Sequence, residues 1–247
     1  MHNGPTRIVL VTGGSRGIGA EVARQFTDPD THVIVNYREK ANRANSIAAA
    51  IRDAGGHAST IGADISNDAD ATAMIDSVRS RFGRLDALIL NASGGLEPGA
   101  DPGYAMRLNR DAQRHLAQLA VPLMPAGGRI VFVTSHQAHF FPNKAVPKGY
   151  SAVAASKRAG ETALYAMRSV FSRAGVHLTV VSGDMIDGTI IVRLLQRRDP
   201  DEVDARRAHG TLPTVNEFAA AIISATDSPS PQGIVYVGGA DYLMTAA

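Results

Sequence analysis

Short apolar runs rich in β-branched residues recur along the chain, separated by longer stretches with helical spacing. Each run is too short for a helix and is continuously apolar, which is typical of a strand buried on both faces. Strands that alternate with helices in this way predict parallel βαβ units with right-handed crossovers. The chain is therefore predicted to form a doubly wound, Rossmann-type α/β fold, a parallel sheet flanked by helices, as a single domain over residues 1–247.

The same pattern assigns the individual elements. Strands are expected at 7–12, 32–36, 59–62, 86–90, 130–133, 176–181 and 233–237. Helices are expected directly after the glycines at 13–19, and over 40–54, 67–83, 104–124, 151–173 and 215–226. Residues 184–213 are charged and irregular, and one or two short helices are expected there.

Composition narrows the functional classes. The net charge is only +2 and the arginines are scattered, so neither a nucleic acid nor a membrane is an expected partner. The absence of cysteine excludes disulfides and thiolate metal sites, and no metal is expected. The first residues, MHNGPTR, lack an apolar signal region, so the cytoplasm is the expected location.

A glycine-rich loop, VTGGSRGIG from Val11 to Gly19, follows the first expected strand. Glycine permits the positive φ of a tight turn and a close approach of the backbone to a ligand. The helix that begins beyond the loop offers free N–H groups and the positive end of its dipole, which suits a pyrophosphate. In the context of strand, loop, helix and second strand, the loop predicts a bound dinucleotide rather than a plain turn.

The spacing of these glycines, G-x-x-x-G-x-G, resembles that of the short-chain dehydrogenase/reductase family, whose loop reads T-G-x-x-x-G-[IL]-G. Three further marks agree: Asp64 in GADI, the NASG that begins at Asn91, and Asn109 within the expected helix 104–124. The resemblance covers nearly the whole chain. It implies an NAD(P)-dependent oxidoreductase that acts on a small molecule. It also implies that the cofactor contacts Gly13, Ser15, Arg16, Gly17, Ile18, Gly19, Asp64, Ile65, Asn91 and Ala92.

The end of the second strand bears on the choice of nicotinamide cofactor. An acidic residue there would bond the adenosine ribose of NAD and repel a 2′-phosphate. This chain has Asn36-Tyr37-Arg38 instead, with Arg16 in the glycine loop. Two guanidinium groups near the ribose favour NADP(H) over NAD(H). The alternative is that Arg38 only begins a solvated helix with Glu39 and Lys40.

A carbonyl reduction needs a hydride donor, an acid for the developing alkoxide, and a group that tunes that acid. The family supplies a serine at the end of the fifth strand, and a tyrosine and a lysine as Y-x-x-x-K on the next helix. Ser135 occupies the position of the serine, and Lys157 that of the lysine, which also binds the nicotinamide ribose. The tyrosine position is filled by Val153, which can neither donate nor accept a proton.

Tyr150 is the nearest phenol, seven residues before Lys157. On an ideal helix two such residues share a face but stand about 10.5 Å apart along the axis, too far for direct coupling of their pKa values. An irregular entry to the helix, permitted by Pro147 and Gly149, would change this separation. Tyr150 is thus a candidate catalytic acid, and the alternative is a packing role just before a helix cap at Ser151.

His136 and His139 are alternative acids, because they lie in the loop after Ser135 and a histidine titrates near neutrality. A solvated or structural histidine is the other interpretation. This loop is longer than the family's usual one. Asn109 is expected to kink or hydrate its helix near the catalytic centre, with a plain polar helix position as the alternative.

After the sixth strand the family often has P-G, where this chain has Ser182-Gly183. Gly183 is expected to keep the turn beside the cofactor, and Thr189 to reach the carboxamide of the nicotinamide. Residues 184–213 would then form a lid over the substrate. The resemblance also implies a homo-oligomer, a dimer or a tetramer, formed through the long helices.

Two functions therefore remain open. The first is an NADP(H)-dependent oxidoreductase that interconverts a carbonyl and a secondary alcohol with a displaced proton donor, which Ser135, Lys157 and Asn109 together favour. The second is a cofactor-binding protein of the same fold without ordinary reductase activity, either regulatory or an enzyme of another reaction such as elimination. Val153 favours the second.

Overall fold

The computed structural model describes residues 5–96, 101, 103–147, 149–198, 200–208 and 210–239. Within them, seven strands form one parallel sheet in the order β3-β2-β1-β4-β5-β6-β7. The strands are β1 (Arg7–Val11), β2 (Thr31–Tyr37), β3 (His57–Gly62), β4 (Ala87–Leu90), β5 (Arg129–Ser135), β6 (His177–Gly183) and β7 (Ile234–Val237). The strand order reverses between β1 and β4, so a crevice is expected outside the carboxyl ends of these strands. The predicted doubly wound fold is confirmed.

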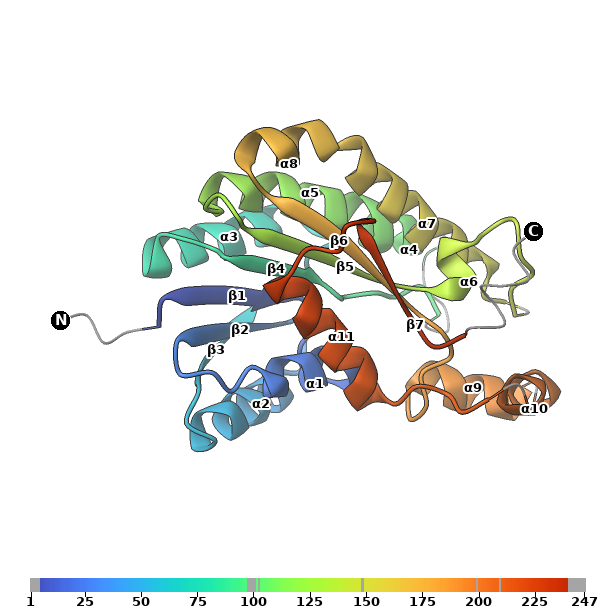
Figure 1. Cartoon of the computed structure of the whole chain (residues 1–247). Helices are drawn as coiled ribbons and strands as arrows, with labels where there is room; N and C mark the ends of the chain where they lie inside the picture. Colours follow the sequence, from blue (N-terminus) through green and yellow to red (C-terminus); the bar gives the residue numbers. More distant parts are fainter. Residues whose placement is uncertain are drawn as a thin grey trace.

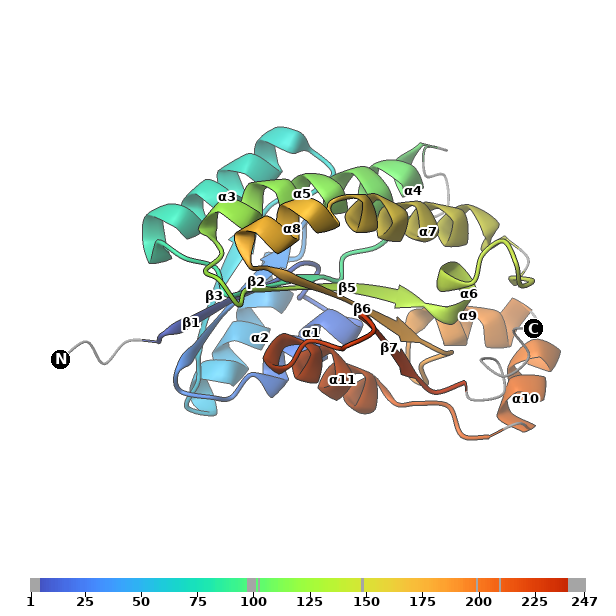
Figure 2. The ribbon, with the colours of Figure 1, turned by 45° about the horizontal axis from the view of Figure 1, so that its top comes forward.

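Helices cover both faces of the sheet (Figure 1, Figure 2). One face carries α1 (Gly17–Gln25), α2 (Ala41–Asp53) and α11 (Val215–Asp227). The other carries α3 (Asp68–Phe82), α5 (Ala112–Ala120), α7 (Ser151–Ala166) and α8 (Arg168–Ala174). Beyond the carboxyl ends of β5 and β6 lie α6 (His136–His139), α9 (Ile190–Arg198) and α10 (Pro200–Ala208).

The two faces of the sheet build two separate apolar layers. Along β1, Ile8 and Leu10 belong to one buried cluster, and Val9 and Val11 to the other. Successive side chains of a strand point to opposite faces, so a strand covered on both sides must be apolar at every position. Each such side chain contributes about 1.5–3 kcal/mol on burial. This requirement explains why the expected strands appear as continuous apolar runs.

Two expected helices are interrupted. The helix expected over 104–124 consists of α4 (Tyr104–Met106), a π-helical turn η1 (Arg107–Asp111), α5 and a 3₁₀ turn η2 (Val121–Leu123). The helix expected over 151–173 stops at Ala166 and resumes at Arg168. At the break the Met167 amide bonds the Leu164 carbonyl at 3.0 Å, which tightens the last turn of α7 to 3₁₀ spacing.

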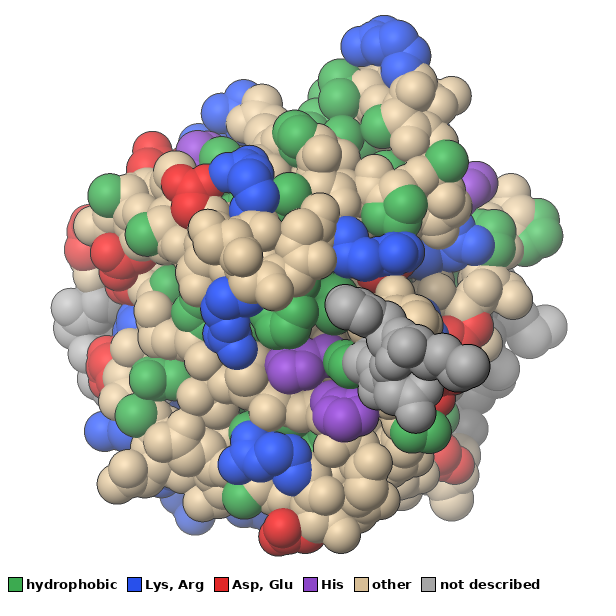
Figure 3. All heavy atoms as spheres, turned by 90° about the vertical axis from the view of Figure 1, so that its left-hand side faces the viewer, with side chains coloured by type: hydrophobic (Ala, Val, Ile, Leu, Met, Phe, Trp, Pro, Cys, Tyr) green, Lys and Arg blue, Asp and Glu red, His purple; other side chains and the backbone are tan. Residues whose placement is uncertain are grey.

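The amino ends of the strands lie on the side of the molecule shown in Figure 3. On this face the Lys and Arg side chains are scattered among other side chains and form no continuous basic stripe (Figure 3). In the described part of the chain, no helix combines the length and the apolar character that crossing a bilayer requires.

Helix α7 approaches the π-helical turn η1 closely. A Cβ added at Gly160 would lie 2.0 Å from the carbonyl oxygen of Asn109, so a side chain has no room there. One turn earlier, the Asn109 amide group donates to the Ser156 hydroxyl at 2.9 Å. The π-helical turn and the glycine together allow the two helix backbones to touch at the level of Lys157.

Gly160→Ala should therefore destabilise the protein by about 1–3 kcal/mol, because the added methyl group overlaps backbone that cannot move without displacing α7. The midpoint of urea unfolding measures this change. Thr162→Ala is the matched control, since Thr162 is exposed on the same helix; it should be neutral or slightly stabilising because alanine has the higher helix propensity. Equal stability of both variants would refute the close packing.

Candidate active site

The glycine loop is held by polar contacts with the segment after β4. Gly13 and Gly17 adopt positive φ values of 64° and 55°. The Asn91 side-chain amide donates to the Thr12 carbonyl at 2.9 Å, and the Thr12 hydroxyl accepts the backbone amides of Asn91 and Ala92, each at 3.0 Å. A Cβ at Gly19 would lie 2.5 Å from the Asn91 side chain and from the Gly13 carbonyl. Glycine is therefore required at 19 by packing, and at 13 and 17 by the turn.

The first turn of α1 is open to a ligand. Its N-cap residue, Arg16, is extended and exposed, and no side chain caps the helix. A Cβ added at Gly17 would meet nothing within 4 Å. The backbone N–H groups that begin this helix, with Ser15 and Ile18 beside them, therefore match the donor set that a pyrophosphate requires. The predicted dinucleotide loop has the expected geometry.

Asn36, in the segment Asn36-Tyr37-Arg38 that ends the second strand, is buried. Its Oδ1 accepts the Gly13 amide at 3.3 Å, and its Nδ2 donates to the Ala63 carbonyl at 3.2 Å. Asn36 thus joins the glycine loop to the segment after β3. Sequence reasoning missed this role, although a polar residue within an apolar strand was a usable signal.

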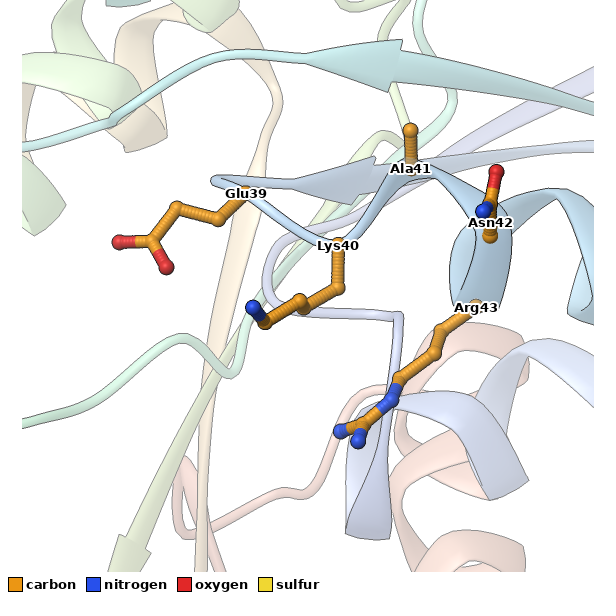
Figure 4. A pocket seen from close by; sticks show the side chains of 5 residues that line it. All are labelled: Glu39, Lys40, Ala41, Asn42 and Arg43. Atoms are coloured by element: carbon orange, nitrogen blue, oxygen red, sulfur yellow. The ribbon is translucent and has the colours of Figure 1, made fainter.

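Basic side chains gather around the carboxyl end of β2 and the beginning of α2. Residues 39–43 border a cavity of about 290 Å³, and Figure 4 shows Lys40 and Arg43 extending from this turn on the same side of the ribbon. Arg38 forms an ion pair with Glu39 at 2.8 Å and contacts the Tyr104 hydroxyl, with its guanidinium 5.8 Å from the centre of the Tyr104 ring. Arg38 is exposed, so whether it binds a phosphate or only begins a solvated segment stays a prediction.

Asp64 and Ile65 lie at the carboxyl end of β3, as expected. The Asp64 carboxylate accepts the Ser66 amide at 2.9 Å and the Ser66 hydroxyl at 2.7 Å. Ile65 is buried in the apolar layer that also contains Leu10 and Leu90. The loop after β3 is therefore a rigid neighbour of the glycine loop.

Ser135 and Tyr150 lie together. Ser135 ends β5, and its Oγ is 3.4 Å from the Tyr150 hydroxyl oxygen. Tyr150 is the N-cap residue of α7, and its backbone amide bonds the Pro147 carbonyl at 2.9 Å, so a turn precedes the helix. Burial raises the pKa of Tyr150, while the contact with Ser135 acts in the opposite direction. The phenol is therefore a proton donor at neutral pH, and its hydroxyl adjoins the serine.

Val153 does not enter this centre. Its side chain is 4% exposed and packs beside Gly95, where an added Cβ would lie 3.4 Å from Val153 Cγ2. The valine thus serves the contact between α7 and the segment after β4. The family's usual tyrosine position has become part of the core.

Lys157 projects from α7 without a hydrogen-bond acceptor among the described residues. Burial lowers its pKa to about 8. A partly buried ammonium without a protein acceptor is suited to bind hydroxyl groups of a ligand.

Asn109 connects three parts of the site. It lies in the π-helical turn, its side chain donates to the Gly94 carbonyl at 2.9 Å, and it accepts the Gly94 amide at 3.3 Å. The same amide group donates to Ser156, the neighbour of Lys157. The expected local irregularity of this helix is present, whereas the contact with Ser156 was not foreseen.

The two loop histidines do not face Tyr150. His136 is fully buried, with Nδ1 2.8 Å from the Ser182 hydroxyl and Nε2 3.1 Å from the Gly238 carbonyl. Burial lowers its pKa. His139 pairs with Glu161 at 2.9 Å. Both imidazoles hold the fold, which leaves Tyr150 as the candidate acid in contact with Ser135.

Gly183 lies beside Ser135 in the sheet register, and a Cβ there would lie 2.7 Å from the Phe218 ring. The Thr189 hydroxyl donates to the Ile186 carbonyl at 2.8 Å and lies 3.4 Å from the Val192 amide at the start of α9. Its expected contact with a nicotinamide carboxamide stays a prediction. The expected lid contains α9 and α10.

An ion pair that sequence reasoning missed anchors α10. The Arg206 Nε donates to the Asp184 carboxylate at 2.7 Å, directly after β6. The Asp184 side chain is only 2% exposed. Asp184 and Arg206 are far apart in sequence and belong to no motif, so only the tertiary structure identifies their contact.

A family model described as short chain dehydrogenase matches residues 7–199. The chain belongs to the short chain dehydrogenase family.

Curated relatives of this short chain dehydrogenase include 1-cyclohexenylcarbonyl-CoA reductase of Streptomyces collinus, 34% identical over 73% of this chain and 65% of that protein. A cyclic-di-GMP-binding biofilm dispersal mediator protein of Escherichia coli is 33% identical over 73% of each chain. The chain covers 65%, 59% and 65% of the first three curated reductases that it matches. A solved short chain dehydrogenase of Burkholderia cenocepacia, in complex with NADP, is 26% identical, with a TM-score of 0.79 over 96% of this chain and 97% of that one.

Lys157→Met should stabilise this short chain dehydrogenase at pH 7 in the absence of cofactor. The lysine pKa is about 8 in the folded protein against 10.5 when unfolded. Between these values the unfolded chain binds more protons, so stability rises with pH across the window, and below it the folded protein carries the full cost of the buried cation. Methionine removes that cost, about 1–3 kcal/mol.

Urea unfolding at pH 7 and near pH 10.5 measures this difference. The gain from Lys157→Met should fade at the higher pH, where the lysine is neutral in the folded protein and half protonated in the unfolded chain. Lys40→Met, at an exposed position, should change little at either pH. A stability loss at pH 7 in the Lys157 variant would show that the ammonium is well compensated in the folded state.

Proposed function

We propose that this chain is an NADP(H)-dependent oxidoreductase that reduces a carbonyl group of a small molecule to a secondary alcohol, with Tyr150 as the proton donor. The observation that carries the proposal is the contact between the Tyr150 and Ser135 hydroxyl groups at 3.4 Å. Through this contact, Tyr150 takes the place of the acid that the family has at the position of Val153. Catalytic hydrogen bonds are often long before the substrate is present, so this distance suits a pair that closes on a carbonyl oxygen.

Each residue of the centre has a role in this reaction. The bound cofactor supplies the hydride. The Ser135 hydroxyl orients the substrate oxygen, and Tyr150 gives it a proton as the alkoxide forms. Lys157 would hold the ribose of the cofactor through hydrogen bonds, and Asn109 holds the turn of α7 that carries Lys157. The raised pKa of Tyr150 keeps the phenol in its protonated form, so the proton is present when the alkoxide forms.

The basic groups at the carboxyl end of β2 support NADP(H) as the cofactor. Lys40 and Arg43 border a hollow after the carboxyl end of β2, Arg38 directly precedes them, and Asn36 is engaged within the protein. With Arg16 of the glycine loop, these are the cations that we propose for the 2′-phosphate. A 2′-phosphate would bring two negative charges to these side chains. Solved relatives bound to NADP add support.

Other expected properties remain part of the proposal. We infer a cytoplasmic homo-oligomer, a dimer or a tetramer, with residues 184–213 as a lid over the substrate. The second candidate function, cofactor binding without reduction, has its support in the buried Val153 and in the Escherichia coli relative named for cyclic-di-GMP binding.

Tyr150→Phe should lower the rate of NADPH-dependent ketone reduction about 10²–10⁴-fold, because it removes the acid but preserves the ring. The dissociation constant of NADPH, from nicotinamide fluorescence, should stay the same. Thr162→Ala, an exposed change on the same helix, is the control and should keep its activity. NADPH binding with no turnover of any ketone in the unmodified protein, or full activity of Tyr150→Phe, would favour the second function or another acid.

Arg38→Asp should weaken NADPH binding about 10–100-fold, the effect of losing charge-assisted bonds to a phosphate, with much less change for NADH. Fluorescence titration with both cofactors measures the ratio. Arg173→Asp, an equal change of charge on α8, should leave the ratio unaltered. A ratio of dissociation constants that does not move in Arg38→Asp would contradict the assigned phosphate site.

A further inference from the structure

Helix α6 is a single turn that begins directly after Ser135, and its first residues determine where the serine hydroxyl lies. Ser135 is its N-cap residue, and the Ser135 Oγ accepts the Ala138 amide at 3.3 Å. The same oxygen lies 3.4 Å from the Tyr150 hydroxyl. One helical turn is not stable by itself in water. Contacts with other elements must therefore hold α6, and with it the Ser135 hydroxyl.

His139 makes the farthest-reaching of these contacts. Its Nδ1 lies 2.9 and 3.0 Å from the two carboxylate oxygens of Glu161 in α7, and its Nε2 lies 3.0 Å from the Tyr236 hydroxyl in β7. A carboxylate only accepts hydrogen bonds, so Nδ1 is the donor, and in the neutral imidazole Nε2 then accepts from the phenol. Burial raises the pKa of Tyr236, as does the charge of Glu161, which keeps that phenol proton in place.

Glu161 is the buried centre of this network. Its side chain is 0% exposed, and Arg158 lies 2.9 Å from its Oε1. A buried carboxylate is costly unless it is paired and fully hydrogen-bonded. The Arg158 guanidinium supplies the charge, and His139 supplies a bond from outside α7. The carboxylate thus joins α7 to α6 and, through the imidazole, to the edge strand β7.

We propose that His139 and Glu161 are positioning residues of the carbonyl site, which hold α6 against α7 and β7 so that the Ser135 hydroxyl faces Tyr150. The inference rests on the proposed function, since Ser135 and Tyr150 matter as a pair only for that reaction. His136 holds the other end of α6 through Ser182 and Gly238. These contacts hold α6 in place within the long loop that joins Ser135 to Tyr150.

His139→Asn tests the proposal, because asparagine is too short to reach Glu161 and Tyr236 together. We expect kcat for ketone reduction to fall about 10-fold or more, since a small misplacement of a reacting group is costly. The dissociation constant of NADPH should be unchanged, because the glycine loop lies elsewhere. His177→Asn, at an exposed histidine that begins β6, is the matched control and should keep its kcat.

A conservative pair at Glu161 separates positioning from bulk packing. Glu161→Gln keeps an oxygen that can accept from both His139 and Arg158, so it should retain most of kcat. Glu161→Leu removes both bonds and should lose as much as His139→Asn. The double variant His139→Asn/Glu161→Leu should have the same kcat as the single variant with the lower kcat, because both changes break one network. Lower thermal stability with unchanged kcat for the folded enzyme would overturn the proposal.

A spectroscopic readout keeps the test informative if no ketone is reduced. The ¹³Cζ resonance of Tyr150, assigned by its loss in Tyr150→Phe, reports the surroundings of the phenol. His139→Asn should shift it, and His177→Asn should not. A shift in a protein without reductase activity would support the positioning role and refute only the proposed function. An unmoved resonance would refute the positioning role.

Discussion

The arrangement of the candidate site depends on the packing of α7 against the π-helical turn η1. At Gly160 there is no room for a side chain beside the Asn109 carbonyl. Asn109 uses its side chain in two directions, toward Ser156 on α7 and toward Gly94 after β4. The segment after β4 also binds the glycine loop through Asn91. One continuous set of polar contacts therefore connects the cofactor loop with the helix that carries Lys157. A buried network of this kind is rigid only when each member is satisfied.

The position of the candidate proton donor follows from this packing. Because α7 is fixed by its contact with η1, the family's tyrosine position at Val153 faces the segment around Gly95 and is filled by an apolar side chain. The loop before α7 brings a different phenol, Tyr150, to the end of β5. A long loop needs its own support, and the histidines of α6 provide it through β6, β7 and α7. The same residues that sequence analysis offered as acids thus serve as structural anchors.

The sequence predicted most of the fold because its main physical requirement is local. A strand covered on both faces is apolar at each position, and a glycine with positive φ marks a turn. Asn67, the first residue of the helix expected over 67–83, caps α3 by accepting the Ala69 and Asp70 amides. The irregularity at Asn109 was expected, whereas its π-helical form and the break of the second helix at Met167 were not. They depend on contacts with distant segments, such as the approach of α7 to Asn109, and leave no periodic signal in the sequence.

By itself, the sequence determined the order of the strands and helices, the dinucleotide loop, and the absence of a phenol at Val153, since each depends on a residue type at a fixed spacing. The tertiary structure alone decided that Tyr150 adjoins Ser135, that His136 and His139 are buried anchors, and that Asn36 and Glu161 bind partners in other elements. These outcomes depend on the direction of side chains from segments far apart in the chain. The direction of these side chains is fixed only when the helices pack on the sheet. The spacing of residues along the chain does not specify which side chains of distant segments meet.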